Sequence, residues 1–181
     1  MANEQQVAAW QVSGTCEWCI VDGQLEVRPA DGRATGALGD FDWLRYKPLI
    51  KSAVFLPGVK ATACEGMFLD CDQLTVADLS RLDGSSVTSL ADMFDGCSSL
   101  VSVDLSGING SNINSLEGMF NSCSELVSVA LPDLSDSMAT SVQAMFFNCA
   151  KLADLDLADV RMPLLSNMEN MFGGLQEPDE A

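Results

Sequence analysis

Apolar residues recur along this chain with a period of 26 residues. Met-Phe pairs begin at residues 67, 93, 119, 145 and 171, so the spacing never slips. A Cys stands four residues after each of the first four Met residues, and a Leu follows three residues later. The residues on this period include Phe68, Phe94, Phe120, Phe146, Phe172, Cys71, Cys97, Cys123 and Cys149. A fixed period of this length predicts stacked structural units that share one core.

In each unit, one segment alternates apolar and polar residues as a strand does, and another has apolar residues at a helical spacing. The pattern L-x-x-Φ-x-L points Val103 inward and Asp104 outward in the second unit. Val87, Leu90 and Met93 fall on one face of a helical period, which predicts a helical or 3-10 return. The sequence therefore predicts an α/β repeat solenoid of the leucine-rich-repeat type, with a single parallel sheet of about five short strands.

The N-terminal segment predicts a β-hairpin that caps the first unit. Asp22-Gly23 is a strong hairpin turn, and its register pairs Trp18 with Val27, Ile20 with Leu25, and Glu17 with Arg28. A shortened first strand follows around Ala53 and Phe55, but which residues of Phe55-Leu56 point inward is left open. The predicted segments are a mobile N-terminus (1–11), the β cap with the shortened repeat (12–62), the solenoid (63–175) and an acidic tail (176–181).

The repeat resembles the BspA-type leucine-rich-repeat surface proteins of bacteria, in their 26-residue branch. The resemblance rests on the pattern M-F-x-x-C-x-x-L-x-x-Φ-x-L and on the order of the cap residues, from Gly14-Thr15-Cys16-Glu17-Trp18 to Pro57-Gly58-Val59. It covers about residues 12–175, although Ala130-Leu131-Pro132 departs from the usual acidic-Leu-Ser. The resemblance implies a cell-surface or secreted protein that binds a protein partner, and it implies no catalytic residue.

The seven cysteines are expected to be reduced and mostly buried. Neighbouring Cys residues of the column would lie about 5 Å apart, so distance alone does not exclude disulfides. A small apolar side chain that recurs because the repeat does is the better interpretation. Cys16 and Cys19 form a C-x-x-C pair, but on a strand they point to opposite faces. We expect these two thiols to be the more accessible ones.

The net charge of −17 excludes some classes of binding partner. Residues 67–172 hold 15 of the 26 acidic residues and only 3 of the 9 basic ones. This distribution argues against nucleic acid and anionic membranes as partners, and no apolar run reaches the ~20 residues of a membrane span. The N-terminus has no recognisable export signal. The chain contains no His, so no Ser/His or Cys/His catalytic scheme can be assembled. We expect no enzyme, no cofactor and no metal.

The outward strand positions are the predicted binding surface. They form a flat, mildly acidic face on which a basic protein partner could dock, because an uncovered solenoid sheet is where such proteins bind partners. The candidate residues are Asp78, Ser102, Asp104, Ser128, Asp154 and Asp156. Two alternatives remain open: this face is only solvated, or the chain is a structural spacer that associates end to end through its last coil.

Overall fold

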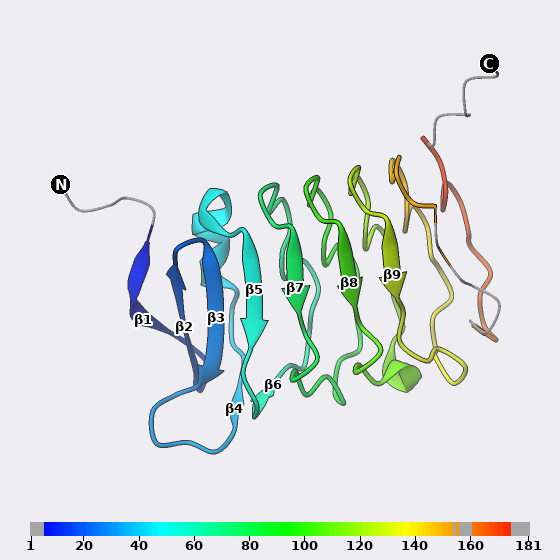
Figure 1. Cartoon of the computed structure of the whole chain (residues 1–181). Coiled ribbons are helices and arrows are strands. Elements are labelled where there is room, and N and C mark those ends of the chain that lie inside the picture. The colour runs from blue at the N-terminus through cyan, green and yellow to red at the C-terminus, as the bar shows by residue number, and fades with distance from the viewer. Residues whose placement is uncertain (1–5, 154, 156–160, 175–181) are drawn as a thin grey trace.

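The computed structural model describes residues 6–153, 155 and 161–174. It forms an elongated stack with a seven-stranded sheet along one side (Figure 1). The sheet has the order β1-β2-β3-β5-β7-β8-β9, and a separate pair joins β4 to β6. The elements are β1 (Val7–Ser13), β2 (Cys16–Val21), β3 (Gln24–Pro29), β4 (Gly36–Ala37), η1 (Asp42–Leu49), β5 (Ser52–Phe55), β6 (Val59–Lys60), β7 (Val76–Asp78), β8 (Ser102–Asp104), η2 (Gly110–Asn112) and β9 (Ser128–Ala130).

The parallel half of the sheet follows the sequence period. Ala77 pairs with Val103, and Val103 pairs with Val129, so each coil places equivalent residues side by side. Ala53 of β5 pairs with Ala77, which confirms the shortened first strand, and Phe55 is buried. We number the coils from residue 63: coils 1 to 4 cover 63–88, 89–114, 115–140 and 141–166, and coil 5 begins at residue 167. The fifth expected strand, around Leu155, lies largely outside the described residues.

The β cap has the predicted hairpin register and one further strand. β2 and β3 pair Trp18 with Val27 and Ile20 with Leu25, while Glu17 and Arg28 form an ion pair at 2.7 Å. The first eleven residues were expected to form a mobile N-terminus, but residues 7–11 lie in a strand. They belong to β1, which pairs with β2 in antiparallel fashion through an irregular register. The sheet is therefore mixed, with an antiparallel cap and a parallel remainder.

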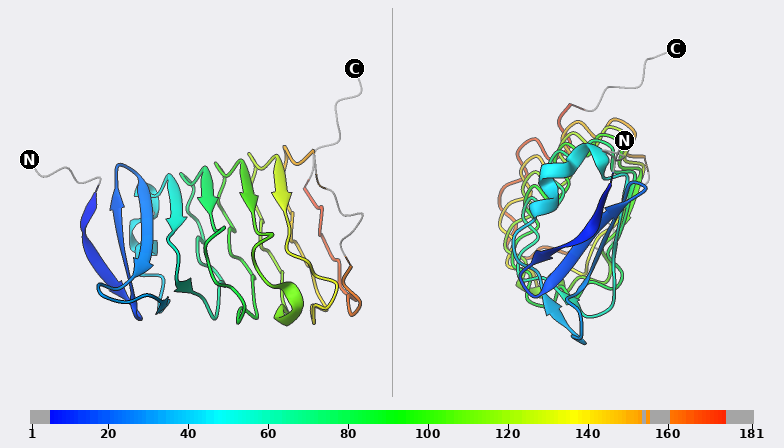
Figure 2. Two further views of the ribbon diagram at one scale, coloured as in Figure 1. Left: turned by 60° about the horizontal axis from the view of Figure 1, so that its bottom comes forward. Right: turned by 90° about the vertical axis from the view of Figure 1, so that its left-hand side faces the viewer.

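The return side of each coil was predicted to be helical or 3-10, and it is built mainly of successive turns (Figure 2). In coil 1, Met67 N–H donates to the Cys64 carbonyl, Leu69 N–H to Gly66, and Cys71 N–H to Phe68, so three β-turns follow one another. The remaining N–H groups bond the next coil instead, which a helix would not allow. We call this wall the turn ladder, and it comprises residues 64–70, 90–96, 116–122, 142–148 and 168–174.

Apolar columns fill the space between the sheet and the turn ladder. The rings of Phe68, Phe94, Phe120, Phe146 and Phe172 stack with nearly parallel planes and centroids 5.4–5.7 Å apart. The first four of these rings are fully buried, as are the four cysteines of the repeat. All seven cysteines are free and buried. Cys19 is the most exposed of them, as expected, whereas Cys16 is no more accessible than the cysteines of the repeat. Cys16 lies in the core and Cys19 is 6% exposed on the opposite face of β2.

Candidate functional site

The outer surface of strands β5, β7, β8 and β9 is the sheet face, and the structure shows most of the predicted residues there. Asp78, Ser102 and Asp104 are exposed, whereas Ser128 is half-buried. Asp78 is directly opposite Asp104, and Ser102 is opposite Ser128. Asp104 has Ala130 as its next neighbour, so the acidic column is interrupted after two members. The remaining predicted residues, Asp154 and Asp156, lie outside the described residues.

Each of the two carboxylates of the sheet face accepts hydrogen bonds from the serine two residues further along the chain. The Asp104 carboxylate accepts hydrogen bonds from the Ser106 N–H at 2.9 Å and from the Ser106 hydroxyl at 2.6 Å. Asp78 accepts a bond from the Ser80 N–H at 3.0 Å. These bonds lower the pKa of both Asp side chains, because they favour the charged form. The sheet face therefore presents two fixed negative charges that already have local donors.

Exposed apolar side chains lie beside these charges. Val76 on β7 is 46% exposed, and Val101 and Val127 line the start of the next two strands with 45% and 37% exposure. The Val101 N–H bonds the Thr75 carbonyl and the Val127 N–H bonds the Val101 carbonyl, so the two valines stand one coil apart. Pro132, two residues after the end of this strand, is buried, because β9 ends at Ala130 and the alternation does not extend beyond it.

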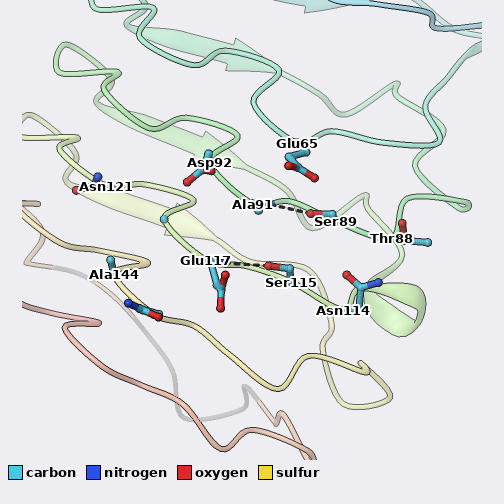
Figure 3. Close-up of a pocket in the computed structure, with 12 residues that line it drawn as sticks. Glu65, Thr88, Ser89, Ala91, Asp92, Asn114, Ser115, Glu117, Asn121 and Ala144 are labelled. Carbon is cyan, nitrogen blue, oxygen red and sulfur yellow. Dashed lines mark hydrogen bonds between the residues drawn. The ribbon is translucent and has the colours of Figure 1, made fainter.

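A second surface on the turn ladder was not predicted. A groove of about 690 Å³ runs across coils 1 to 4. Figure 3 shows Glu65, Asp92 and Glu117 in this groove, on three successive coils. We call it the acidic groove, and its other lining residues are Thr88, Ser89, Ala91, Asn114, Ser115, Gly118, Asn121, Gln143 and Ala144.

Local backbone bonds fix the walls of the acidic groove. The Ser89 hydroxyl oxygen accepts a hydrogen bond from the Ala91 N–H at 3.2 Å, and Ser115 does the same for Glu117 at 3.4 Å (Figure 3). Asp92 has a positive φ of 52°, a conformation that Asp tolerates better than most residues. The space beside its carboxylate is free because the next coil has Gly118 at the equivalent position. The groove therefore depends on residue choices in two adjacent coils.

The carboxylates of the acidic groove repel each other. Partial burial raises the pKa of Asp92, and the charges of Glu65 and Glu117 raise it further. The pKa of Asp95 is raised in the same way by partial burial and by Asp92 and Asp70. The ion pairs found among the described residues involve other acids, with Lys47–Asp70 and Lys60–Asp83 the nearest along the chain. The groove therefore holds negative charge that no described cation neutralises.

The chemistry available at either surface is recognition of a cationic or polar group. Burial raises the pKa of the repeat thiols, to about 12 for Cys71 and for Cys149, so these cysteines are poor nucleophiles. Within the residues that the structure describes, no cluster of three or more His, Cys, Asp or Glu could hold a metal ion. A smaller cavity of about 310 Å³ lies on the cap beside Cys19, Glu26 and Ser52.

The sequence contained one sign of the acidic groove. Glu65 and Glu117 are 52 residues apart, two full periods, and Asp92 follows the intermediate position by one residue. Sequence reasoning placed the function on the strands, because alternation identifies outward strand residues but not which turn residues line a common groove. The groove was therefore missed.

Comparisons with known proteins assign a family to this coil stack. A sequence model of the family described as "Mycoplasma protein of unknown function, DUF285" matches residues 62–181. The match covers more than half of the chain, so the chain belongs to the DUF285 family. It begins at the end of the cap and includes the turn ladder. No curated protein shows significant sequence similarity to this chain.

Two solved structures are similar to this chain. One is a leucine-rich cell surface protein from Faecalibacterium prausnitzii A2-165, with 16% identity, a TM-score of 0.39, and coverage of 81% of this chain and 54% of that protein. The other is a leucine-rich repeat protein from Eubacterium ventriosum ATCC 27560, with 12% identity, a TM-score of 0.35, and coverage of 92% and 63%. This chain thus spans less than two thirds of either protein. No described helix has the length and apolar character needed to cross a membrane.

Proposed function

We propose that this chain is a non-enzymatic bacterial protein, located at the cell surface or secreted, that binds a basic protein partner. The location follows the sequence resemblance to bacterial surface repeat proteins. The binding role is supported by the stack itself, which offers long exposed walls whose residues repeat at a constant spacing. Solenoids of this kind bind partners along such walls.

One observation indicates that the partner is basic. Glu65, Asp92 and Glu117 lie in one groove without a described cation. Partial burial raises the pKa of Asp92, and the charges of Glu65 and Glu117 raise it further. A Lys or Arg side chain of a partner would remove this repulsion and would form charge-assisted hydrogen bonds. A partner with basic residues at the spacing of the coils would contact several carboxylates at once.

The sheet face is the second candidate surface for the same function. In its favour, Val76, Val101 and Val127 are exposed beside the charges of Asp78 and Asp104. A partner there would bury apolar area and meet two carboxylates. The charges of this face already have serine donors, so a basic partner gains less from them than from the groove.

Two matched variants separate the surfaces. Glu65→Gln/Glu117→Gln removes two of the three carboxylates of the acidic groove. Asp78→Asn/Asp104→Asn neutralises the two carboxylates of the sheet face, with the same change in net charge and little change in shape. Surface plasmon resonance would measure binding of the intact chain to a panel of extracellular matrix and serum proteins over a salt series. We expect saturable binding that weakens with salt and that the groove variant loses.

The outcomes assign the function. Loss of binding in the sheet-face variant alone would move the site to β7 and β8. Equal loss in both variants would show a nonspecific effect of net charge and would contradict the groove proposal. If no panel member binds and both variants remain folded by circular dichroism, the partner-binding proposal fails and the spacer alternative replaces it.

A further inference from the structure

One sequence motif has no part in the proposed function. Asn109-Gly110-Ser111 has the pattern N-x-S/T, and no other Asn of the chain is followed two residues later by Ser or Thr. With a middle residue other than Pro, this pattern is the acceptor motif for N-glycosylation, in which a sugar is attached to the side-chain nitrogen of Asn. Because so short a motif also occurs by chance, its exposure and its hydrogen bonds decide whether it suits this reaction.

The motif lies on the edge of coil 2 that joins the sheet to the turn ladder. Asn109 is the N-cap residue of η2, which is the short green coil at the lower edge of the stack in Figure 1. Asn109 is exposed, Gly110 is buried and Ser111 is half-buried. A Cβ atom on Gly110 would overlap the backbone carbonyl oxygen of Asp133 in coil 3, so the glycine fixes the turn against its neighbour. The Asn109 side chain therefore lies outside the core on a well-anchored turn.

Ser111 holds the carboxamide of Asn109 in one orientation. The Asn109 Oδ1 atom accepts hydrogen bonds from the Ser111 N–H at 2.9 Å and from the Ser111 hydroxyl at 2.8 Å. A backbone N–H only donates, so the atom that faces it is the carboxamide oxygen and not Nδ2. Nδ2 points away from Ser111, and it donates no hydrogen bond to any residue that the structure describes. The nitrogen that a sugar would modify is thus not engaged by the described part of the chain.

The equivalent turn of coil 1 shows that this shape does not require an amide. Asp83-Gly84-Ser85 occupies the same positions one period earlier. Asp83 Oδ1 accepts hydrogen bonds from the Ser85 N–H at 3.2 Å and from the Ser85 hydroxyl at 2.7 Å. Both turns use only an oxygen of the first side chain, so an Asp at position 109 would make the same bonds. The turn therefore explains the oxygen and the glycine of the motif, but not the Nδ2 group.

The neighbouring coils leave this edge open. A sugar is bulky and solvated, so its acceptor must face solvent. Ser85 in coil 1 and Ser135 in coil 3 are both exposed small residues at this edge. A sugar on Asn109 would extend into solvent beside them, while the sheet face begins on the far side of the Ser106-Gly107 turn. Glycosylation here is compatible with the folded stack and with either candidate binding surface.

We propose that Asn109 is an acceptor for N-linked glycosylation by a glycosyltransferase, with a phosphate-activated sugar as the donor. In this reaction, the Asn109 Nδ2 atom attacks the anomeric carbon of the sugar and a C–N bond forms. The bond between the anomeric carbon and the phosphate oxygen breaks, the phosphate leaves with the bonding electron pair, and Nδ2 loses one proton. The proposal goes beyond partner binding and does not depend on the acidic groove.

Mass spectrometry of the chain isolated from the cells that produce it tests the proposal directly. We expect the peptide that contains Asn109 to carry the mass of at least one hexose or N-acetylhexosamine, with fragment ions that place the sugar on Asn109. The Asn109→Gln variant from the same cells should lack this mass. An unmodified Asn109 would overturn the proposal. Conversion of Asn109 to an acid without a sugar would overturn it as well, because that is deamidation of an Asn-Gly pair and needs no donor.

A second experiment tests the geometry on the folded chain. The purified chain would be incubated with UDP-glucose and a soluble N-glycosyltransferase that recognises N-x-S/T, and glucose addition would be followed by intact mass. We expect one glucose on Asn109, none in Ser111→Ala, and a second glucose in Asp83→Asn, which gives the turn of coil 1 the same N-G-S sequence. Addition only after unfolding in urea would contradict the argument from the exposed turn. Circular dichroism of the variants confirms that they remain folded.

Discussion

The thiol of Cys123 donates a hydrogen bond to the backbone carbonyl oxygen of Phe94 in the preceding coil, at 3.1 Å. The same carbonyl accepts the N–H of Cys97 at 3.0 Å, so both of its lone pairs are used. Cys149 repeats the bond to the carbonyl of Phe120, also at 3.1 Å. The cysteine column therefore joins neighbouring coils. If Ala replaced one of these cysteines, the carbonyl would lose its S–H donor and keep only the N–H bond within its own coil.

Alkylation of the native protein should be slow at all seven cysteines, because each is buried and the thiolate is the reactive form. Cys19 should react first, since its side chain is the most exposed of the seven. Mass spectrometry after timed exposure to iodoacetamide would give the order. Rapid modification of Cys97 or Cys123 in folded protein would show that the column is not closed.

The same thiols make stability depend on alkaline pH. Burial raises the pKa of Cys71 from 9.0 to about 12. Because the folded state keeps the neutral thiol, this contribution is complete below pH 9 and is lost as pH rises through about 9 to 12. Urea unfolding at increasing pH should show this decline. A Cys71→Ala variant should lose less stability over the same interval, and an equal loss would contradict the assignment.

Phe120→Ala should lower the free energy of unfolding by about 3–5 kcal/mol, because the ring is fully buried and its loss leaves a cavity in the core. Phe172→Ala is the matched control. It removes the same ring from the same column at a position that is 42% exposed, so its cost should be clearly smaller. Urea denaturation would measure both, and a loss under ~1 kcal/mol for Phe120→Ala would contradict the stacked column.

Asp92→Asn and Asp104→Asn should change stability in opposite directions. The pKa of Asp92 is raised, so its charge destabilises the folded state, and Asp92→Asn should be more stable at pH 7. The pKa of Asp104 is lowered by Ser106, so Asp104→Asn should be less stable at pH 7. The difference for Asp92 should close as pH falls through its raised pKa toward about 4, whereas the difference for Asp104 should close only as pH falls below about 4 and through its lowered pKa. Thermal unfolding at pH 3 and pH 7 would check the signs, and two shifts of the same sign would contradict the argument.

Gly118→Ala should destabilise the protein by about 1–2 kcal/mol, because an L-residue at positive φ is strained and its Cβ would contact the Asp92 carboxylate. Ala144 shows that an Ala with a φ of 53° is accepted at this position when the equivalent residue of the preceding coil, Gly118, has no side chain. Asp92 is the equivalent residue for Gly118, so the cost of Gly118→Ala should fall in an Asp92→Gly background. A double-mutant cycle by urea unfolding would measure the coupling, and strictly additive effects would exclude the contact.

The features that depend on local pattern could be predicted from the sequence. The pairing of Trp18 with Val27 followed from the Asp22-Gly23 turn and a period of two. The stacked phenylalanines followed from the 26-residue spacing, because equivalent residues of consecutive coils must lie above each other. The outward position of Asp78 and Asp104 followed from alternation within single strands.

The features that depend on contacts between coils could not be predicted in the same way. Apolar residues three and four apart suit either a helix or a series of turns, so the spacing of Leu90 and Met93 did not distinguish them. Asp92, Ser122 and Ala144 all have a positive φ, but they are different residue types, so the sequence gives no common signal for this conformation. β1 pairs with an irregular register, and its sequence around Val7 does not alternate cleanly.

The hydrogen bonds of the turn ladder run from each coil to the carbonyls of the next, as from Phe94 N–H to Met119, and give this wall of the stack an electrical polarity. The bonded N–H and C=O groups point along the same axis in every coil, so their peptide dipoles add as they do in an α-helix. The cap end carries the partial negative charge, where the indole and ammonium groups of Trp43 and Lys47 lie. The opposite end carries the partial positive charge, in a molecule whose net charge is −17. Each further coil that adopts the same turns would lengthen this macrodipole and strengthen the bonds already in line.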